Sequence, residues 1–166
     1  MSRRVVIHDA SVLIDLAAGG LLGSFVRLGW HSETTDLVLQ EVQGDHTLSN
    51  WVGEHLQVTA LSSENLIELR LSASKGLSNG DLSALYLAQK RQGTLLTNDG
   101  KLRKAAEAAK VPYQGILGIM TCLHEAKICS GKRLCQALDE ILAVGARLPP
   151  KDCEERRATW SEGQIP

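Results

Sequence analysis

The sequence has few aromatic residues, no excess charge of one sign and no long apolar run, and each lack excludes a class of protein. Aromatic residues make up 4% of the 166, so Leu, Val, Ile and Ala must build the core. Eighteen Lys and Arg against nineteen Asp and Glu give a formal net charge of −1. This balance disfavours a protein that coats nucleic acid through bulk charge, although it permits a local basic patch. The richest apolar stretch, residues 10–22, contains Asp15 and is shorter than the ~20 residues of a membrane helix.

The chain also lacks the usual signals of export and of cysteine-based metal binding. Its first apolar run, residues 5–7, stops at His8 and is too short for a signal peptide. The four cysteines show no CxxC spacing, which favours free thiols in a reducing compartment over a zinc site. We therefore expect a cytoplasmic protein with no membrane partner.

What is present is an alternation of short β-branched runs with helical patterns. The patterns predict strands at residues 4–8, 30–33, 56–61, 94–97 and 111–113, and helices at residues 12–18, 21–28, 35–43, 63–74, 81–91, 101–110, 116–128 and 132–144. Strands separated by helical crossovers imply an α/β fold, with a central, mainly parallel sheet flanked by helices on both faces. We expect one domain over residues 1–145 and a polar, helical C-terminal arm or tail over residues 146–166.

Three aspartates lie where these predicted strands end or the next helices begin. Asp9 directly follows the first strand, Asp99 follows the strand at residues 94–97, and Asp81 begins a helix. In open α/β sheets, ligands bind beyond the carboxyl ends of the strands. Aspartate is also a favoured N-cap residue, and for any one of the three alone capping is the simpler interpretation.

Glu41 is not explained by capping, because it lies near the end of its predicted helix. It follows Leu37 by four residues and Val38 by three, so we expect it on their core-directed face, where a carboxylate needs a partner or a metal. Four carboxylates at one end of a parallel sheet predict a site for Mg²⁺ or Mn²⁺, which prefer oxygen ligands. Without the ion, their mutual repulsion should raise at least one pKa. Metals in such sites serve phosphodiester hydrolysis.

Four short segments resemble, in order and spacing, the successive motifs of the PIN-domain family, over about residues 4–120. Residues 111–120 are also similar to the segment that follows the last acidic motif in a VapC-like subgroup. The four segments are His8-Asp9-Ala10-Ser11, Thr35-Asp36-Leu37-Val38-Leu39-Gln40-Glu41, Gly80-Asp81-Leu82-Ser83-Ala84-Leu85 and Leu96-Thr97-Asn98-Asp99.

The resemblance implies a metal-dependent endoribonuclease, very often the toxin of a toxin–antitoxin pair. Its partners would be an RNA substrate, a small antitoxin protein and a second copy of the chain in a homodimer. By position, Asp9, Glu41, Asp81 and Asp99 would be the acidic quartet, which binds Mg²⁺ or Mn²⁺ directly or through water. One of the four would also accept a proton from the attacking water.

Further positions follow from the same resemblance. Ser11 and Thr97 match positions whose hydroxyls help hold the metal or its water. Many family members carry another acid just after the last motif, whereas here Gly100 and Lys101 follow Asp99. This departure argues against a second metal ion more than against the first.

Several residues outside the quartet have two interpretations. Lys101, Arg103 and Lys104 form either a solvated helix face or a patch that steers RNA phosphates toward the metal. Trp160, in the C-terminal arm, is a candidate for docking on a partner.

Two other functions remain open. One is a regulatory or binding PIN module with a residual site, which the intact quartet disfavours. The other is a different α/β phosphohydrolase with an aspartyl nucleophile at Asp9. Such enzymes commonly place a second acid two residues later, where this chain has Ser11.

Overall fold

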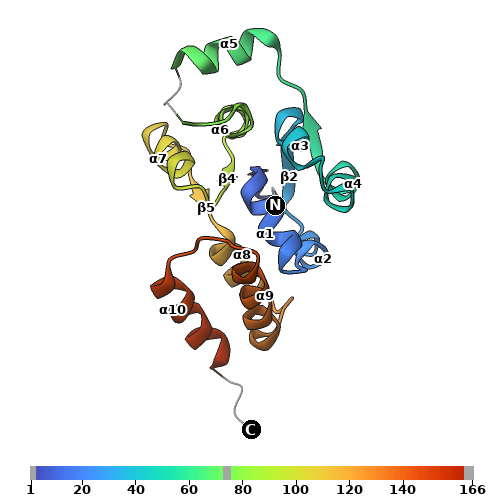
Figure 1. Cartoon of the computed structure of the whole chain (residues 1–166), viewed down its shortest axis with the longest axis vertical. Helices are drawn as coiled ribbons and strands as arrows, with labels where there is room; N and C mark the ends of the chain where they lie inside the picture. Colours follow the sequence, from blue (N-terminus) through green and yellow to red (C-terminus); the bar gives the residue numbers. More distant parts are fainter. Residues whose placement is uncertain (1–2, 73–75, 163–166) are drawn as a thin grey trace. The chain divides into compact units, whose positions relative to one another are not determined.

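The structure is a computed structural model that describes residues 3–72 and 76–162 (Figure 1). The chain divides into two compact units. A sheet unit comprises Met1–Ile14 and Trp30–Gln114, and a helical unit comprises Asp15–Gly29 and Gly115–Pro166. Helix α1 (Ala10–Ala18) begins in the sheet unit and ends in the helical unit.

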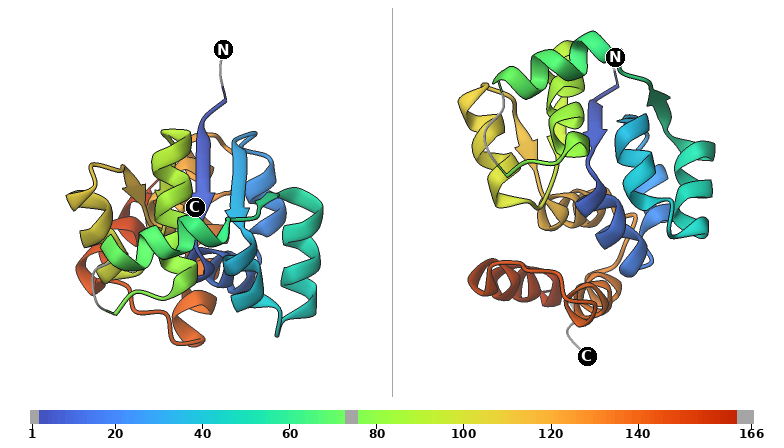
Figure 2. Two further views of the ribbon diagram at one scale, coloured as in Figure 1. Left: turned by 90° about the horizontal axis from the view of Figure 1, so that it is seen from above. Right: turned by 45° about the horizontal axis from the view of Figure 1, so that its top comes forward.

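The sheet unit is built on five parallel strands in the order β3-β2-β1-β4-β5. In the left view of Figure 2, the arrows of the neighbouring strands β1 and β2 point the same way. Strand β1 lies at the centre, where Val6 and Ile7 are fully buried, as are Leu95 and Leu96 on its neighbour β4. The prediction of an α/β fold with a parallel sheet is thus confirmed. The strands are β1 (Val5–His8), β2 (His31–Thr35), β3 (Gln57–Thr59), β4 (Thr94–Leu96) and β5 (Tyr113–Gln114).

Helix α6 is the main helix packed on this sheet, and it contacts β1, β2 and β4. It starts with a capping box between Ser78 and Asp81 and ends at Gln92, whose φ of 53° is left-handed. Its first turn therefore carries Asp81, one of the carboxylates predicted to form a site. The other helices of the sheet unit are α3 (Asp36–Val42), α4 (His46–His55), α5 (Ser63–Ser72) and α7 (Gly100–Ala108), and α6 itself spans Asn79–Arg91.

The helical unit contains α2 (Leu22–Val26), α8 (Ile116–Glu125), α9 (Gly131–Ala143) and α10 (Pro150–Ser161). Helix α9 buries Leu134, Leu138 and Ile141, which recur at helical spacing along one face. Helix α10 packs on α8 and α9. Trp160 of α10 is 1% exposed, so the expectation that it docks on a partner is wrong: it belongs to the core of this unit.

Two differences between the predicted and observed elements arise at capping residues, while β3 (Gln57–Thr59) is shorter than predicted and β5 (Tyr113–Gln114) begins later. The sequence patterns predict a polar turn at Gly44 and Asp45 and no helix at α4. In the structure, the Asp45 side chain caps α4 by accepting a hydrogen bond from the Leu48 amide at 3.0 Å. Strand β2 continues to Thr35, which caps α3 instead of belonging to it. The last residues of the helix predicted at 63–74 lie outside the described part of the chain. Among the helices that the structure does describe, none has both the length and the hydrophobicity that crossing a membrane requires.

Candidate functional site

Asp9 is the most buried carboxylate of the predicted quartet, with 1% of its surface exposed. It follows β1 directly, and the Val12 amide of α1 donates a hydrogen bond of 2.9 Å to its Oδ1. The Ser11 hydroxyl lies 2.8 Å from both carboxylate oxygens, and the Thr97 hydroxyl donates to Oδ2. Asp9 therefore does cap a helix, as the simpler interpretation held, but it is also enclosed by two hydroxyl groups.

Burial raises the pKa of Asp9 from 3.8 to about 6, although its hydrogen bonds from Thr97, Val12 and Ser11 act in the opposite direction. The negative charge of Asp81 raises this pKa further, which places the two carboxylates within electrostatic reach of each other. His8, the residue before Asp9, supplies no compensating charge at neutral pH, because burial lowers its pKa to about 3. Asp9 is thus a buried acid in surroundings that disfavour its negative charge.

The loop after β4 is attached to the same cluster through its backbone. The Asn98 amide donates to the Ser11 hydroxyl at 3.1 Å, and the Asp99 amide donates to the Thr97 hydroxyl at 3.0 Å. The carboxylate of Asp99 faces its own helix and accepts hydrogen bonds from the amides of Lys101 and Leu102. Asp99 is therefore the N-cap of α7. Its connection to Asp9 is the Thr97 hydroxyl, which accepts from the Asp99 amide and donates to the Asp9 carboxylate.

A second cluster forms at the start of α6. The Ser78 hydroxyl accepts from the Asp81 amide at 3.0 Å and donates to Glu41 Oε1 at 2.9 Å. The Ser78 amide donates to Asp81 Oδ2 at 3.2 Å. Glu41 and Asp81 come from helices α3 and α6, and Ser78 joins them.

Glu41 is exposed and does not lie on the core-directed face of α3, so the expected orientation is wrong. Helix α3 has only seven residues, and its buried stripe consists of Val38 and Val42. Glu41 lies beside this stripe, and its side chain extends to Ser78 and Gly80 at the start of α6. The association with Asp81 that the sequence suggested is present, but the reason is a contact between two helix ends.

The donors of these clusters suit a hard divalent cation. They are carboxylate and hydroxyl oxygens, and burial raises the pKa of Asp9, so a bound cation would compensate the charge of this carboxylate. In the described residues no group of three or more His, Cys, Asp or Glu is close enough to hold a metal ion. Mg²⁺, however, is usually bound by one or two protein carboxylates and several waters. Asp9 and Asp81 fit that pattern. Hydrogen bonds of Ser78 connect Glu41 to Asp81, and hydrogen bonds of Thr97 connect Asp99 to Asp9.

The basic residues of α7 differ in how they are held. Arg103 is partly buried, its Nε donates to the Thr97 carbonyl at 3.2 Å, and its guanidinium lies 5.5 Å from the centre of the Tyr113 ring. Lys101 and Lys104 are exposed. Of the three predicted RNA-binding residues, Arg103 is the one that bonds to Thr97, and Thr97 in turn contacts Asp9.

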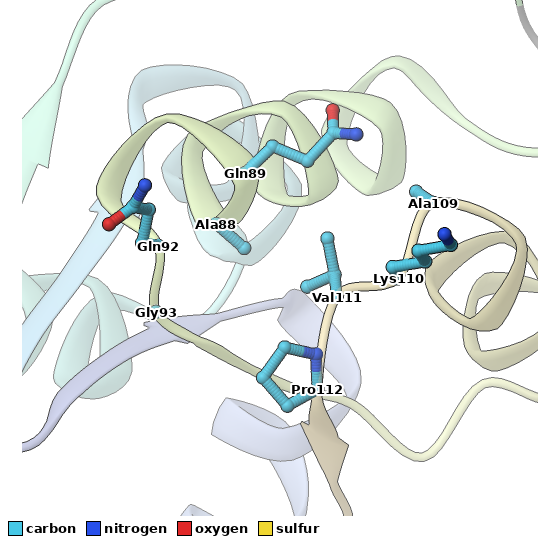
Figure 3. Close-up of a pocket in the computed structure, with 8 residues that line it drawn as sticks. All are labelled: Ala88, Gln89, Gln92, Gly93, Ala109, Lys110, Val111 and Pro112. Carbon is cyan, nitrogen blue, oxygen red and sulfur yellow. The ribbon is translucent and has the colours of Figure 1, made fainter.

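A pocket of about 370 Å³ lies between the ends of α6 and α7, away from these carboxylates. The side chains of Ala88 and Val111 point into the space between the two helix ends (Figure 3). Ala88 follows Asp81 by seven residues along α6, which corresponds to about 10 Å. The pocket therefore belongs to the opposite end of α6 and is not part of the carboxylate site.

Ser78 and Gly80 are parts of the site that were not predicted from the sequence. The signal for Ser78 was present, because Ser followed three residues later by an acid is a capping-box pattern. Its bond to Glu41 joins residues 37 positions apart and had no local signal.

Comparison with known proteins supports this assignment of the fold. The model of the family DUF3368, described as a PIN domain, matches residues 5–162. No curated protein matches the chain. The crystal structure of PAE2754 from Pyrobaculum aerophilum is similar, with 21% sequence identity and a TM-score of 0.51 over 74% of this chain and 98% of that chain. At this identity the likeness concerns the fold alone. Because the family match extends from β1 to the last residues of α10, this chain belongs to the PIN-domain family, whose members are generally nucleases that use divalent metal ions.

Proposed function

We propose that this protein is an endoribonuclease that hydrolyses RNA phosphodiester bonds with Mg²⁺ or Mn²⁺. The observation that carries the proposal is the state of Asp9, a carboxylate 1% exposed, enclosed by two hydroxyls, with its pKa raised to about 6. Burying a carboxylate is unfavourable unless a partner compensates its charge. A bound divalent cation is the partner that fits the oxygen donors around it.

Each residue of the site has a role in this proposal. Asp9 and Asp81 would hold the cation directly, while Glu41 and Asp99 would complete the site directly or through water. The hydroxyls of Ser11 and Thr97 orient the Asp9 carboxylate. The cation would activate a water molecule as the nucleophile and neutralise charge on the leaving oxygen. Arg103 contributes a positive charge beside Thr97, where an RNA phosphate would approach.

We also propose that the protein is a VapC-like toxin that a small antitoxin protein neutralises, and that it acts as a homodimer in the cytoplasm. The support is the order of the four acidic segments and the similarity of residues 111–120 to the corresponding segment of that subgroup. Expression of the chain alone should then arrest growth, and co-expression of the product of the adjacent gene should relieve the arrest. A harmless chain that purifies without a partner would contradict the toxin role and leave the nuclease proposal standing.

The nuclease proposal is tested with purified protein and single-stranded or structured RNA. Cleavage should require Mn²⁺ or Mg²⁺, stop on addition of a chelator, and fall by orders of magnitude in Asp9→Asn while the circular dichroism spectrum is unchanged. Full activity of Asp9→Asn, or activity in chelator, would contradict the proposal. Absence of both cleavage and Mn²⁺ binding would favour a regulatory PIN module. A covalent phosphoryl adduct on Asp9 would favour an aspartyl nucleophile.

A further inference from the structure

Ser78 contacts both acidic residues at the start of α6 and uses a different set of atoms for each. Its hydroxyl proton is donated to Glu41 Oε1 at 2.9 Å, while its hydroxyl oxygen accepts the Asp81 amide at 3.0 Å. Its backbone amide donates to Asp81 Oδ2 at 3.2 Å. One serine therefore fixes the position of two carboxylates that carry the same charge and come from different helices.

Gly80 provides the space that Glu41 occupies. A Cβ atom built on Gly80 would lie 2.1 Å from Glu41 Oε1 and 2.6 Å from Glu41 Cδ. Gly80 is helical, and its φ lies outside the left-handed region that favours glycine, so its backbone does not require it. A glycine in the first turn of a helix has a cost in helix propensity. Its presence here is explained by the carboxylate that lies against it.

We propose that Ser78 and Gly80 are positioning residues that hold the Glu41 carboxylate next to Asp81, so that both serve the same divalent cation. The inference rests on the proposed function, because it assigns these two residues to the metal site of that activity. Neither residue needs to touch the cation or the RNA. They act by fixing Glu41, which is exposed on a short helix and would otherwise be free to point into solvent.

The first test replaces Ser78 with Gly and measures Mn²⁺ affinity by titration calorimetry together with thermal unfolding of the metal-free protein. Glycine is nearly as good an N-cap as serine, so the unfolding temperature should change little. Without the hydroxyl, Glu41 is released, and the Mn²⁺ dissociation constant should rise roughly tenfold or more, as for other residues that orient metal ligands. Ser78→Thr keeps the hydroxyl and should retain the affinity of the wild type.

Ser130→Gly is the matched control for this variant. Ser130 is the N-cap of α9 and accepts from the Arg133 amide at 3.1 Å, which is the capping interaction that Ser78 makes with Asp81. The two glycine variants should show similar small changes in unfolding temperature. Only Ser78→Gly should weaken Mn²⁺ binding, because the described contacts of Ser130 include no carboxylate.

The second test is Gly80→Ala, for which stability and metal affinity should move in opposite directions. The three atoms nearest to the added Cβ all belong to the Glu41 side chain, which can rotate away. Alanine also has the higher helix propensity, so the unfolding temperature of the metal-free protein should stay the same or rise. Mn²⁺ affinity should fall, because the added methyl group displaces the Glu41 carboxylate from its position beside Asp81. A residue with a purely structural role would instead lower stability and leave the metal affinity of the folded protein unchanged.

A double-mutant comparison tests whether both residues act through Glu41. With Glu41→Ala as background, neither Ser78→Gly nor Gly80→Ala should weaken Mn²⁺ binding further. If both single variants bind Mn²⁺ like a wild type that cleaves RNA, the inference is wrong and the proposed function stands. If the wild type itself neither binds Mn²⁺ nor cleaves RNA, the proposed function fails and this inference fails with it.

Discussion

The Thr97 hydroxyl donates a hydrogen bond to Oδ2 of Asp9, a residue 88 positions earlier in the chain. The contact follows from strand order: β4 pairs with β1, His8 is opposite Leu96, and the Asp9 amide donates to the Leu96 carbonyl at 3.1 Å. Neighbouring parallel strands end at the same edge of a sheet. Asp9, which follows β1, therefore lies beside Thr97, which follows β4. The partner of Asp9 is thus set by the topology of the sheet.

Asp9→Asn should remove a pH dependence from the stability of the metal-free protein. The pKa of Asp9 is about 6 in the folded state, against an ordinary value of 3.8. Between these values the folded protein keeps a proton that the unfolded chain has released, so stability is lost as pH rises from about 4 to 6 and stays lower above it. A shift of this size corresponds to about 3 kcal/mol. The asparagine side chain of the variant has no charge to bury.

The measurement is urea unfolding of both proteins in chelator at several pH values between 4 and 8. The free energy of unfolding of Asp9→Asn, minus that of the wild type, should increase from about pH 4 to 6 and then level off. A difference that stays constant with pH would show that Asp9 ionises as it does in the unfolded chain.

Thr97→Val should raise the pKa of Asp9 further, because the Thr97 hydrogen bond is the largest of the contributions that lower it. In the proposed ribonuclease, the acid limb of the pH–rate profile should then move to higher pH, and Mn²⁺ affinity near pH 6 should fall. Thr34→Val is the control, since the buried Thr34 hydroxyl donates to the His8 carbonyl and not to Asp9. Equal shifts of the profile in both variants would indicate a general disturbance of β1.

The sequence was sufficient to locate β1 and β4 and the acidic residues that follow them, whereas the ends of β2, β3 and β5 were placed less accurately. Strand β1 is a short β-branched run, so its end and the position of Asp9 could be located. The same holds for β4 and Asp99, and the alternation of strands with helices implied the parallel sheet. These features are local patterns, or follow from connection rules that apply to any chain.

The features that were missed depend on contacts between distant residues. The orientation of Glu41 was wrong because a seven-residue helix gives too few apolar positions to define its buried face. Trp160 was a candidate for docking on a partner, but its side chain is buried in the helical unit, and its backbone lies against Gly131 at the start of α9. In both cases the outcome depends on which helices pack together, and the sequence does not show which segments will meet.

Arg103→Ala should weaken RNA binding more than Lys104→Ala, although both remove one positive charge from α7. Arg103 is held by the Thr97 carbonyl and the Tyr113 ring, so it loses little freedom when it binds a phosphate. Lys104 is exposed. We expect the RNA dissociation constant to rise roughly tenfold for Arg103→Ala and at most about twofold for Lys104→Ala, with a smaller salt dependence for the former.

Fluorescence anisotropy with a labelled RNA in chelator, at several salt concentrations, measures both effects without cleavage. Equal losses in the two variants would mean that α7 attracts RNA only as a charged face.

Arg91→Ala should destabilise the protein without affecting the metal site. Glu33 is 2% exposed on β2, and its Oε2 accepts a hydrogen bond of 2.9 Å from Arg91 Nε. Removing Arg91 leaves this buried carboxylate with His31 at 3.1 Å, and we expect a loss of about 1 to 3 kcal/mol in urea unfolding. The exposed neighbour Lys90 is the control, and Lys90→Ala should cost less than about 0.5 kcal/mol. A similarly small loss of unfolding free energy in both variants would show that the ion pair between Arg91 and Glu33 does not stabilise the fold. A changed Mn²⁺ affinity of Arg91→Ala would show that Glu33 is coupled to the metal site.

Gly131→Ala should loosen the packing of α10 on α9. A Cβ on Gly131 would lie 1.8 Å from the carbonyl oxygen of Trp160 and 2.7 Å from its carbonyl carbon. These are backbone atoms that cannot rotate away, so α10 itself must shift, and we expect a loss of about 1 to 3 kcal/mol. Gly23→Ala is the control, because a Cβ on Gly23 meets nothing within 4 Å and alanine favours helix α2.

Urea unfolding followed by tryptophan emission measures both variants, with a red shift for Gly131→Ala as Trp160 becomes exposed. Mn²⁺ affinity should be unchanged in both, since every residue proposed for the metal site belongs to the sheet unit. Wild-type stability and emission in Gly131→Ala would contradict the close approach of Trp160 to Gly131.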